Sequence, residues 1–195
     1  MVFRIDFFLL LAVITLLALL ALLAVARWRR APWRSVARAA ALLAFVPYSI
    51  VVFSMTLATL HPVLSSGPPD WPRLLPALVP FHDLAEILSD PSLTPARLFW
   101  NVGGNVLLFV PLGFLLPALR PVSWPRLLLA GLLASASIEG LQLLQYILLG
   151  EDHVVSSDDV LLNVIGASVG YAGFLAVRYA VETLSSRRSE RRLPG

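Results

Sequence analysis

Five segments of this chain are long and apolar enough to cross a lipid bilayer, and they constrain its fold more than any other feature. A transmembrane helix needs about 20 predominantly apolar residues to cross a hydrocarbon core about 30 Å thick. The five segments cover residues 5–26, 36–60, 98–119, 124–149 and 159–180. We therefore expect an all-α fold, a polytopic membrane helix bundle with about five transmembrane helices. Residues 1–195 are expected to form a single integral membrane domain.

The amino-acid composition supports this class and excludes two others. Hydrophobic residues make up 58% of the 195 residues and charged residues 14%, whereas soluble domains have about 45–50% and about 25%. Such a chain has too little polar surface for a soluble globular enzyme and too many apolar residues for a disordered protein. No basic stretch is interleaved with aromatic residues, so nucleic acid is not an expected partner. The expected partner is the lipid bilayer, and the sequence identifies no protein partner.

Arginine residues are distributed unevenly between the loops, and this predicts the orientation of the chain. The connections at 27–35 and 120–126 and the C-terminal segment 185–195 are rich in arginine, whereas the loops at 61–97 and 150–158 carry more acidic residues. Cytoplasmic loops of membrane proteins hold the excess of basic residues. We expect the N-terminus outside, the C-terminus in the cytoplasm, and a frayed basic tail over residues 185–195 near anionic lipid.

The long outer loop at 61–97 contains many prolines, so it cannot form one regular element. Within it, residues 81–88 place Phe81, Leu84, Ala85 and Leu88 on one face of a helix. We therefore expect a short amphipathic helix in the outer membrane interface. The three histidines of the chain all fall in the predicted outer loops, where we expect solvated side chains: His61, His82 and His153.

Polar side chains inside the apolar segments form stripes on three of the predicted helices. The stripes consist of Asn101 and Asn105, of Ser135, Glu139, Gln142 and Gln145, and of Asp159, Asn163, Gly166 and Gly170. Their spacings of three and four residues place each set on one helix face. With the predicted orientation, Glu139 lies near the midplane, and we expect the three stripes to meet in one zone that opens outward. The residues predicted in the outer half of the membrane are Asn101, Asn105, Gln142, Gln145, Asp159 and Asn163. Charged residues in a membrane are costly and mark functional sites.

Several of these residues also have a structural interpretation. Glycines 103, 104, 166, 170 and 173 are expected to permit close helix packing, and the asparagines can act as hydrogen bonds between helices. Asp158 is expected to cap the last helix, whereas Asp159 lies on the polar stripe. Glu139 is the hardest to explain structurally, because it lies near the midplane, and we expect it to be protonated or hydrogen bonded to Gln142 or Asn105.

Three motifs resemble those of the VanZ-like family. They are NVGGNVLLFVPLGFLLP at 101–117, SASIEGLQ at 135–142 and DDVLLNVIGASVGY at 158–171, within a family-like core of about 45–180. The resemblance implies a multi-pass protein of the bacterial cytoplasmic membrane, and the family is named after a protein associated with resistance to the glycopeptide teicoplanin. The motif residues that it implies for a site are Asn101, Asn105, Glu139, Gln142, Asp158, Asp159 and Asn163. His153 stands where the family commonly has arginine.

The sequence leads to one main functional hypothesis and leaves two others open. We expect an outward-facing polar pocket that binds or modifies a lipid-linked or cell-envelope head group, with an effect on glycopeptide tolerance. Glu139 and Asp159 are the catalytic candidates, as a proton donor or acceptor and an orienting carboxylate. The alternatives are a proton- or cation-coupled transporter and a structural membrane subunit, and whether the protein is an enzyme stays open. No cofactor or metal is expected, because the acids and His153 match no standard ligand spacing.

Overall fold

The computed structural model describes residues 2–30, 32–57, 71–149 and 155–190, and all of its regular elements in this part of the chain are helices. They are α1 (Val2–Trp28), α2 (Trp33–Leu57), α3 (Trp71–Ala77), α4 (His82–Ser89), α5 (Pro95–Leu98), the π-helical segment η1 (Phe99–Gly103), α6 (Gly104–Leu119), α7 (Trp124–Leu149) and α8 (Ser157–Glu190). The predicted all-α fold is confirmed.

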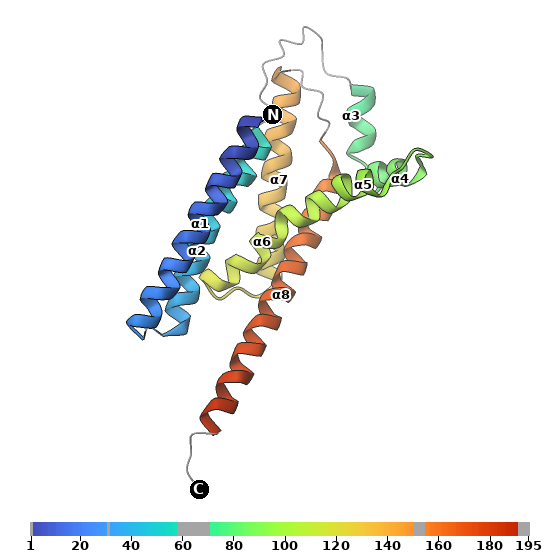
Figure 1. Cartoon of the computed structure of the whole chain (residues 1–195). Coiled ribbons are helices and arrows are strands. Elements are labelled where there is room, and N and C mark those ends of the chain that lie inside the picture. The colour runs from blue at the N-terminus through green and yellow to red at the C-terminus, as the bar shows by residue number, and fades with distance from the viewer. Residues whose placement is uncertain (1, 31, 58–70, 150–154, 191–195) are drawn as a thin grey trace.

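Five helical stretches in the described residues are long and apolar enough to cross a membrane, as the sequence predicts. They are Leu10–Trp28, Ser35–Ser54, Pro95–Leu119, Trp124–Leu148 and Ser157–Leu184. The start of α1 and the end of α8 lie at opposite ends of the bundle (Figure 1). Which end faces the cytoplasm stays a prediction from the arginine distribution.

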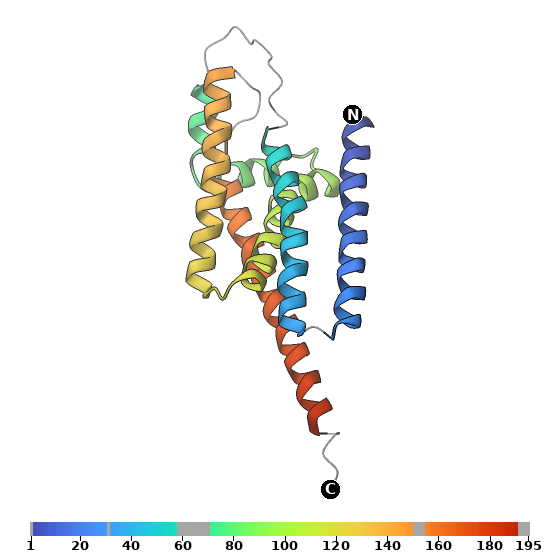
Figure 2. The ribbon, with the colours of Figure 1, turned by 90° about the vertical axis from the view of Figure 1, so that its left-hand side faces the viewer.

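The bundle is built around the crossing of α6 and α8, the helix pair with the most extensive packing. Helix α7 packs mainly against α8, whereas α2 packs against α6 and carries α1 on its other side. Figure 2 shows α1 at the edge of the bundle. Apolar side chains of α1 such as Leu17 and Leu20 are exposed, which is expected of a helix that faces lipid tails.

Glycines make the α6–α8 crossing possible. A Cβ added to Gly166 would lie 2.0 Å from the carbonyl oxygen of Val106, and one added to Gly170 would lie 2.0 Å from that of Val110. From the other side, a Cβ on Gly113 would lie 1.9 Å from the carbonyl oxygen of Ala167. Such contacts are impossible for real atoms, so the two backbones approach closely because these positions have no side chain.

The predicted packing role is confirmed for only two of the five glycines named from the sequence, Gly166 and Gly170. Gly104 has no neighbouring atom within 4 Å of an added Cβ, and Gly173 has only an ordinary contact, 3.7 Å from Phe114. At Gly103 the added atom would meet the flexible ring of Phe99 at 3.2 Å. The third tight contact belongs to Gly113, which was not among the glycines expected to pack.

The third membrane span has a start that the sequence did not predict. The Thr94 hydroxyl caps it by accepting a hydrogen bond of 3.2 Å from the backbone N–H of Arg97, and Pro95 occupies the first turn. The helix then passes through η1 before it continues as α6. A π turn inserts one residue into the helical repeat and is frequent at functional sites. Asn101 lies within it.

Two local predictions have different outcomes. The short amphipathic helix predicted at 81–88 is confirmed as α4, and Leu88 is exposed, as is Phe81 just before the helix. The frayed tail predicted from residue 185 is wrong for its first part, because α8 continues to Glu190. No proline or glycine interrupts the segment 174–190, so the helix can extend beyond the apolar span.

Candidate functional site

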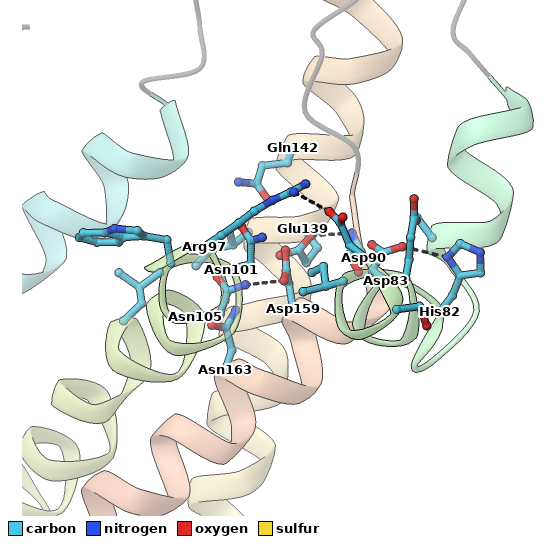
Figure 3. A pocket seen from close by; sticks show the side chains of 18 residues that line it. His82, Asp83, Asp90, Arg97, Asn101, Asn105, Glu139, Gln142, Asp159 and Asn163 are labelled. Carbon is cyan, nitrogen blue, oxygen red and sulfur yellow. Dashed lines mark hydrogen bonds and ion pairs between the residues drawn. The ribbon is translucent and has the colours of Figure 1, made fainter. Parts of the chain in front are cut away.

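A cavity of about 870 Å³ opens between α4, the start of α6, α7 and α8. Figure 3 shows that its side chains come from all of these elements and that Asn105, Glu139 and Asp159 lie close together. Six residues that the sequence predicts for a site line it: Asn101, Asn105, Glu139, Gln142, Asp159 and Asn163. The three polar stripes therefore meet, as we expected from their positions on the helices.

A hydrogen bond between α6 and α8 orders one side of this cavity. The Nδ2 of Asn105 donates to the Oδ1 of Asp159, so the amide fixes the orientation of the carboxylate. Asp159 lies in the first turn of α8, and it lines the cavity rather than the membrane surface. The pair lies beside the close α6–α8 contact at Val106 and Gly166.

Glu139 is buried, with 7% of its surface exposed, and has a different partner from those expected. Its Oε2 accepts a hydrogen bond of 3.4 Å from the backbone N–H of Ser156, whereas Asn105 is bonded to Asp159. The contact joins the middle of α7 to the residue just before α8. The expectation that Gln142 or Asn105 would bind Glu139 is therefore wrong. The spacing of residues along α7 cannot predict this contact, because the partner is a backbone N–H from another segment of the chain.

Two amide oxygens at this cavity have no hydrogen-bond partner among the described residues. Asn163 is 2% exposed and its Nδ2 donates to the Ser135 hydroxyl at 2.9 Å, but its Oδ1 accepts no hydrogen bond there. The Oε1 of Gln142 is likewise buried and unpaired within the described residues. A buried polar atom without a partner costs about 1–3 kcal/mol. Both oxygens lie behind the surface of the cavity, and the described residues leave their hydrogen-bonding capacity unused.

Asp158 does not line the cavity, and it caps a different helix from the one expected. One of its carboxylate oxygens accepts from the backbone N–H of Phe81 and the other from that of Leu84 at 2.9 Å. These N–H groups belong to the start of α4, where a carboxylate is favourable. The cap of α8 itself is Ser156, whose hydroxyl accepts from the Asp158 N–H at 3.2 Å.

Two further contacts explain why Asp158 was assigned to the wrong helix. Phe81 precedes α4 with a φ of 67°, and this left-handed conformation brings its N–H toward α8. The Ser157 hydroxyl donates to the Ala77 carbonyl oxygen at 3.3 Å, just before α4. Consecutive residues of α8 therefore hold the segment 77–84 beside the cavity. A contact between residues 77 positions apart cannot be derived from local sequence.

The polar face of α4 supplies cavity residues that were not expected from the sequence. His82, Asp83 and Glu86 line the cavity, together with Asp90 after the helix. The expectation of a solvated loop histidine is thus incomplete for His82, which is exposed yet faces the cavity; His61 and His153 lie outside the described residues. The sequence did contain a signal for these residues. They lie on the helix face opposite the apolar residues from which the helix was predicted, so they form its polar face.

Arg97 is another cavity residue that was not expected from the sequence. It lies four residues before Asn101 and so extends the polar stripe toward the membrane surface. Its Nη1 pairs with the Oδ2 of Asp90 at 2.5 Å. Hydrogen bonds from Ser92, together with Arg97, hold the pKa of Asp90 below its ordinary value of 3.8.

The cavity is acidic as a whole. Five carboxyl side chains line it, from Asp83, Glu86, Asp90, Glu139 and Asp159, against one arginine. Such a set favours cations and hydrogen-bond donors over a bare anion.

One cluster in the described residues has a composition suited to a metal. His82, Asp83 and Glu86 each offer a ligand atom within 4.8 Å of the others. The Nδ1 of His82 already lies 3.0 Å from Asp83 Oδ1. Exposed acidic groups are common without a metal, and Glu139, Asp158 and Asp159 form no such group in this part of the chain.

The comparison with known proteins identifies one family. A family model described as VanZ/LLP1 matches residues 41–178, which include all three sequence motifs and every residue of the cavity. No curated protein and no solved structure matches the chain.

Proposed function

Because the chain belongs to the VanZ/LLP1 family, we propose that this membrane protein binds the head group of a lipid-linked or cell-envelope compound in the cavity beside α4. The observation that carries the proposal is the meeting of Asn105, Glu139 and Asp159, from three different spans, at one cavity. Intramembrane polar residues are costly, so their convergence indicates a site rather than chance.

The arginine distribution supports an outward-facing cavity in a bacterial cytoplasmic membrane. The cavity lies where α8 begins and α6 begins, and the loops at that end are the acidic ones. Loops that carry few basic residues are typically translocated. A head group displayed at the outer surface of this membrane would reach the cavity from the aqueous side or from the outer leaflet.

The chemistry of the lining restricts the part of the compound that binds. The carboxylates that line the cavity accept hydrogen bonds from N–H and O–H donors and attract an ammonium group. A phosphate without a counter-ion would be repelled. We therefore propose that the cavity holds an amine- or hydroxyl-rich portion, such as an amino sugar or a peptide amine, and leaves any phosphate outside.

For a reaction in this cavity, we propose Glu139 as the proton acceptor or donor and Asp159 as the orienting carboxylate. Glu139 is held by one hydrogen bond through Oε2, which leaves its second oxygen for a bound hydroxyl or amine. Asp159 is fixed by Asn105 and thereby keeps one oxygen for a donor of the ligand. Asn101, Gln142 and Asn163 complete the binding set. A change in the envelope, including glycopeptide tolerance, would be the downstream effect.

Isosteric variants test this proposal. In a strain that lacks its own copy of the gene, Glu139→Gln and Asp159→Asn proteins are expected to reach wild-type levels in the membrane but to fail to restore the teicoplanin tolerance of the parent. Ser137→Ala is the matched control, because Ser137 is an exposed polar residue of α7 that does not line the cavity. Full restoration by both cavity variants would refute the proposed site.

A second measurement separates the alternatives. Proton-dependent flux in liposomes that contain only this protein would favour the transporter hypothesis over head-group binding. Loss of folded protein in Glu139→Gln, without any loss of function per folded molecule, would favour a structural subunit.

A further inference from the structure

A second cavity lies at the opposite end of the membrane helices from the first. It has a volume of about 680 Å³ and is bounded by α2, the end of α6, the turn at 120–122 and the later part of α8. The first cavity, in contrast, lies at the start of both α6 and α8. The two are therefore separate sites, and a ligand of the second cavity is independent of the function proposed for the first.

The walls of this second cavity are apolar and formed by residues of unequal size. Phe114 of α6 and Phe174 of α8 lie edge to face with their ring centroids 6.0 Å apart. On the facing side, α2 presents small residues, including Ala41 and Ala44. Because alanines stand opposite large rings, the helices leave a groove between them that suits a flexible apolar chain.

Three arginines from three separate elements line the same groove: Arg38 of α2, Arg120 of the turn after α6, and Arg178 of α8. All three are exposed. Arg178 has an acidic neighbour, with its Nε 3.7 Å from Glu182 Oε1. Within the described residues, Arg38 and Arg120 form no salt bridge. The groove thus combines an apolar interior with an excess of positive charge.

We propose that this groove binds a phospholipid with an anionic head group. The phosphate would lie among Arg38, Arg120 and Arg178, and an acyl chain would lie along Phe114 and Phe174. Charge complementarity carries the choice of ligand, since guanidinium groups recognise phosphate through paired hydrogen bonds. A phospholipid fits this site better than a simple inorganic anion does. The ion would neutralise the arginines but would leave the apolar wall of the groove exposed.

The location of the groove in the bundle is consistent with this ligand. The groove lies at the end of the helix bundle where the connecting loops are rich in arginine. This end is predicted to face the cytoplasm. Anionic lipids attract basic residues at this surface by about 1 kcal/mol for each arginine, and basic sites between transmembrane helices bind their head groups. The groove would make such a lipid a structural component that joins α2 to the α6–α8 core.

Lipid retention measured by native mass spectrometry tests the proposal. The purified full chain is mixed with phosphatidylglycerol or phosphatidylcholine of the same acyl composition. The wild type is expected to retain phosphatidylglycerol preferentially. Each of Arg38→Gln, Arg120→Gln and Arg178→Gln should weaken retention about fivefold, and the triple variant about a hundredfold.

Arg126→Gln is the matched control, because Arg126 lies at the same end of the bundle, is exposed and does not line the groove. It should retain phosphatidylglycerol like the wild type. A second variant, Ala44→Phe, fills the groove while it keeps all three arginines, and it should also lose the lipid. Thermal unfolding of every variant confirms that it is folded.

Several results would overturn the proposal. These are equal retention of both lipids by the wild type, a loss in Arg126→Gln as large as in the groove variants, or unchanged retention in Ala44→Phe. Displacement of phosphatidylglycerol by millimolar inorganic phosphate would show that the arginines bind the anion without the apolar wall. A lipid-free dimer in which these variants change only the oligomeric state would assign the groove to a second copy of the chain.

Discussion

Asn105 on α6 donates a hydrogen bond to the carboxylate of Asp159 on α8. The residue after Asn105 is Val106, and its carbonyl oxygen lies against Gly166 of α8. The polar pair and the tight backbone contact therefore depend on the same spacing between two helices. A change that separates α6 from α8 should disturb the cavity even when it touches no cavity residue.

Gly166→Ala tests this dependence. The added Cβ would lie 2.0 Å from the Val106 carbonyl oxygen, so the helices must move apart, and the free energy of unfolding should fall by about 1–3 kcal/mol. Unfolding in detergent mixtures measures it. Gly140→Ala is the control, because no atom lies within 4 Å of an added Cβ there. Equal stability of the two variants would contradict the observed helix contact.

Asn105→Ala and Asn101→Ala should differ in stability. Asn105 donates to a carboxylate, and a hydrogen bond to a charged group contributes about 1.5–3 kcal/mol. Asn101 lines the same cavity and has no hydrogen bond to another described side chain. We expect a lower unfolding midpoint for Asn105→Ala and a nearly unchanged one for Asn101→Ala. The reverse order would show that the Asn105–Asp159 pair has little structural value.

Asp158 should control the order of α4. Asp158→Ala removes both acceptors from the Phe81 and Leu84 N–H groups, and loss of such a cap costs about 0.5–2 kcal/mol. Hydrogen exchange of the amides in residues 82–89 is expected to accelerate, with a smaller effect in Asp158→Asn, which keeps one acceptor oxygen. Unchanged exchange in both variants would exclude this capping role.

The Asp90–Arg97 pair should persist to unusually low pH. Ser92 hydrogen bonds, with Arg97, lower the pKa of Asp90 below its ordinary value of 3.8. Because the folded pKa is lowered, the pair contributes stability above the ordinary pKa and loses it as the pH falls through the folded value. Carbon NMR of the Asp90 carboxyl group can follow this titration.

Ser92→Ala should raise the titration midpoint of Asp90, because it removes the hydroxyl contact that is the first cause of the lowered pKa, although the backbone N–H of residue 92 stays in place. Asp83→Asn serves as a control for the general charge of the loop. A midpoint that responds only to Arg97→Gln would contradict the assignment to Ser92.

Single-cysteine variants should reveal which end of the bundle faces outward. The chain has no native cysteine, so each introduced thiol is the sole target. Asn101→Cys and Glu86→Cys should react with a membrane-impermeant maleimide added to intact cells, whereas Arg120→Cys should react only after permeabilisation. Ala167→Cys, at a fully buried position, is the unreactive control. The opposite pattern would reverse the predicted orientation.

Much of the fold could be predicted because each membrane span carries its own signal of length and hydropathy. The convergence of Glu139 with Asp159 was also predictable, since helical spacing and alternating topology place their faces in the same half of the membrane. The contacts of Asp158 were not predictable, because they depend on a turn near residue 81 that only the folded loop supplies. Likewise, the spacing of glycines along α6 cannot distinguish Gly113 from Gly104. Gly113 lies against the backbone of α8, whereas no atom lies within 4 Å of a Cβ added to Gly104.

Helix α8 is a single uninterrupted helix of 34 residues, from Ser157 to Glu190. At about 1.5 Å per residue it extends about 51 Å, well beyond a hydrocarbon core of about 30 Å. Its first turn holds the segment 77–84 beside the acidic cavity, and its later turns form a wall of the arginine-lined groove. A single helix therefore contributes to both cavities, so the length of α8 fixes how far apart they lie.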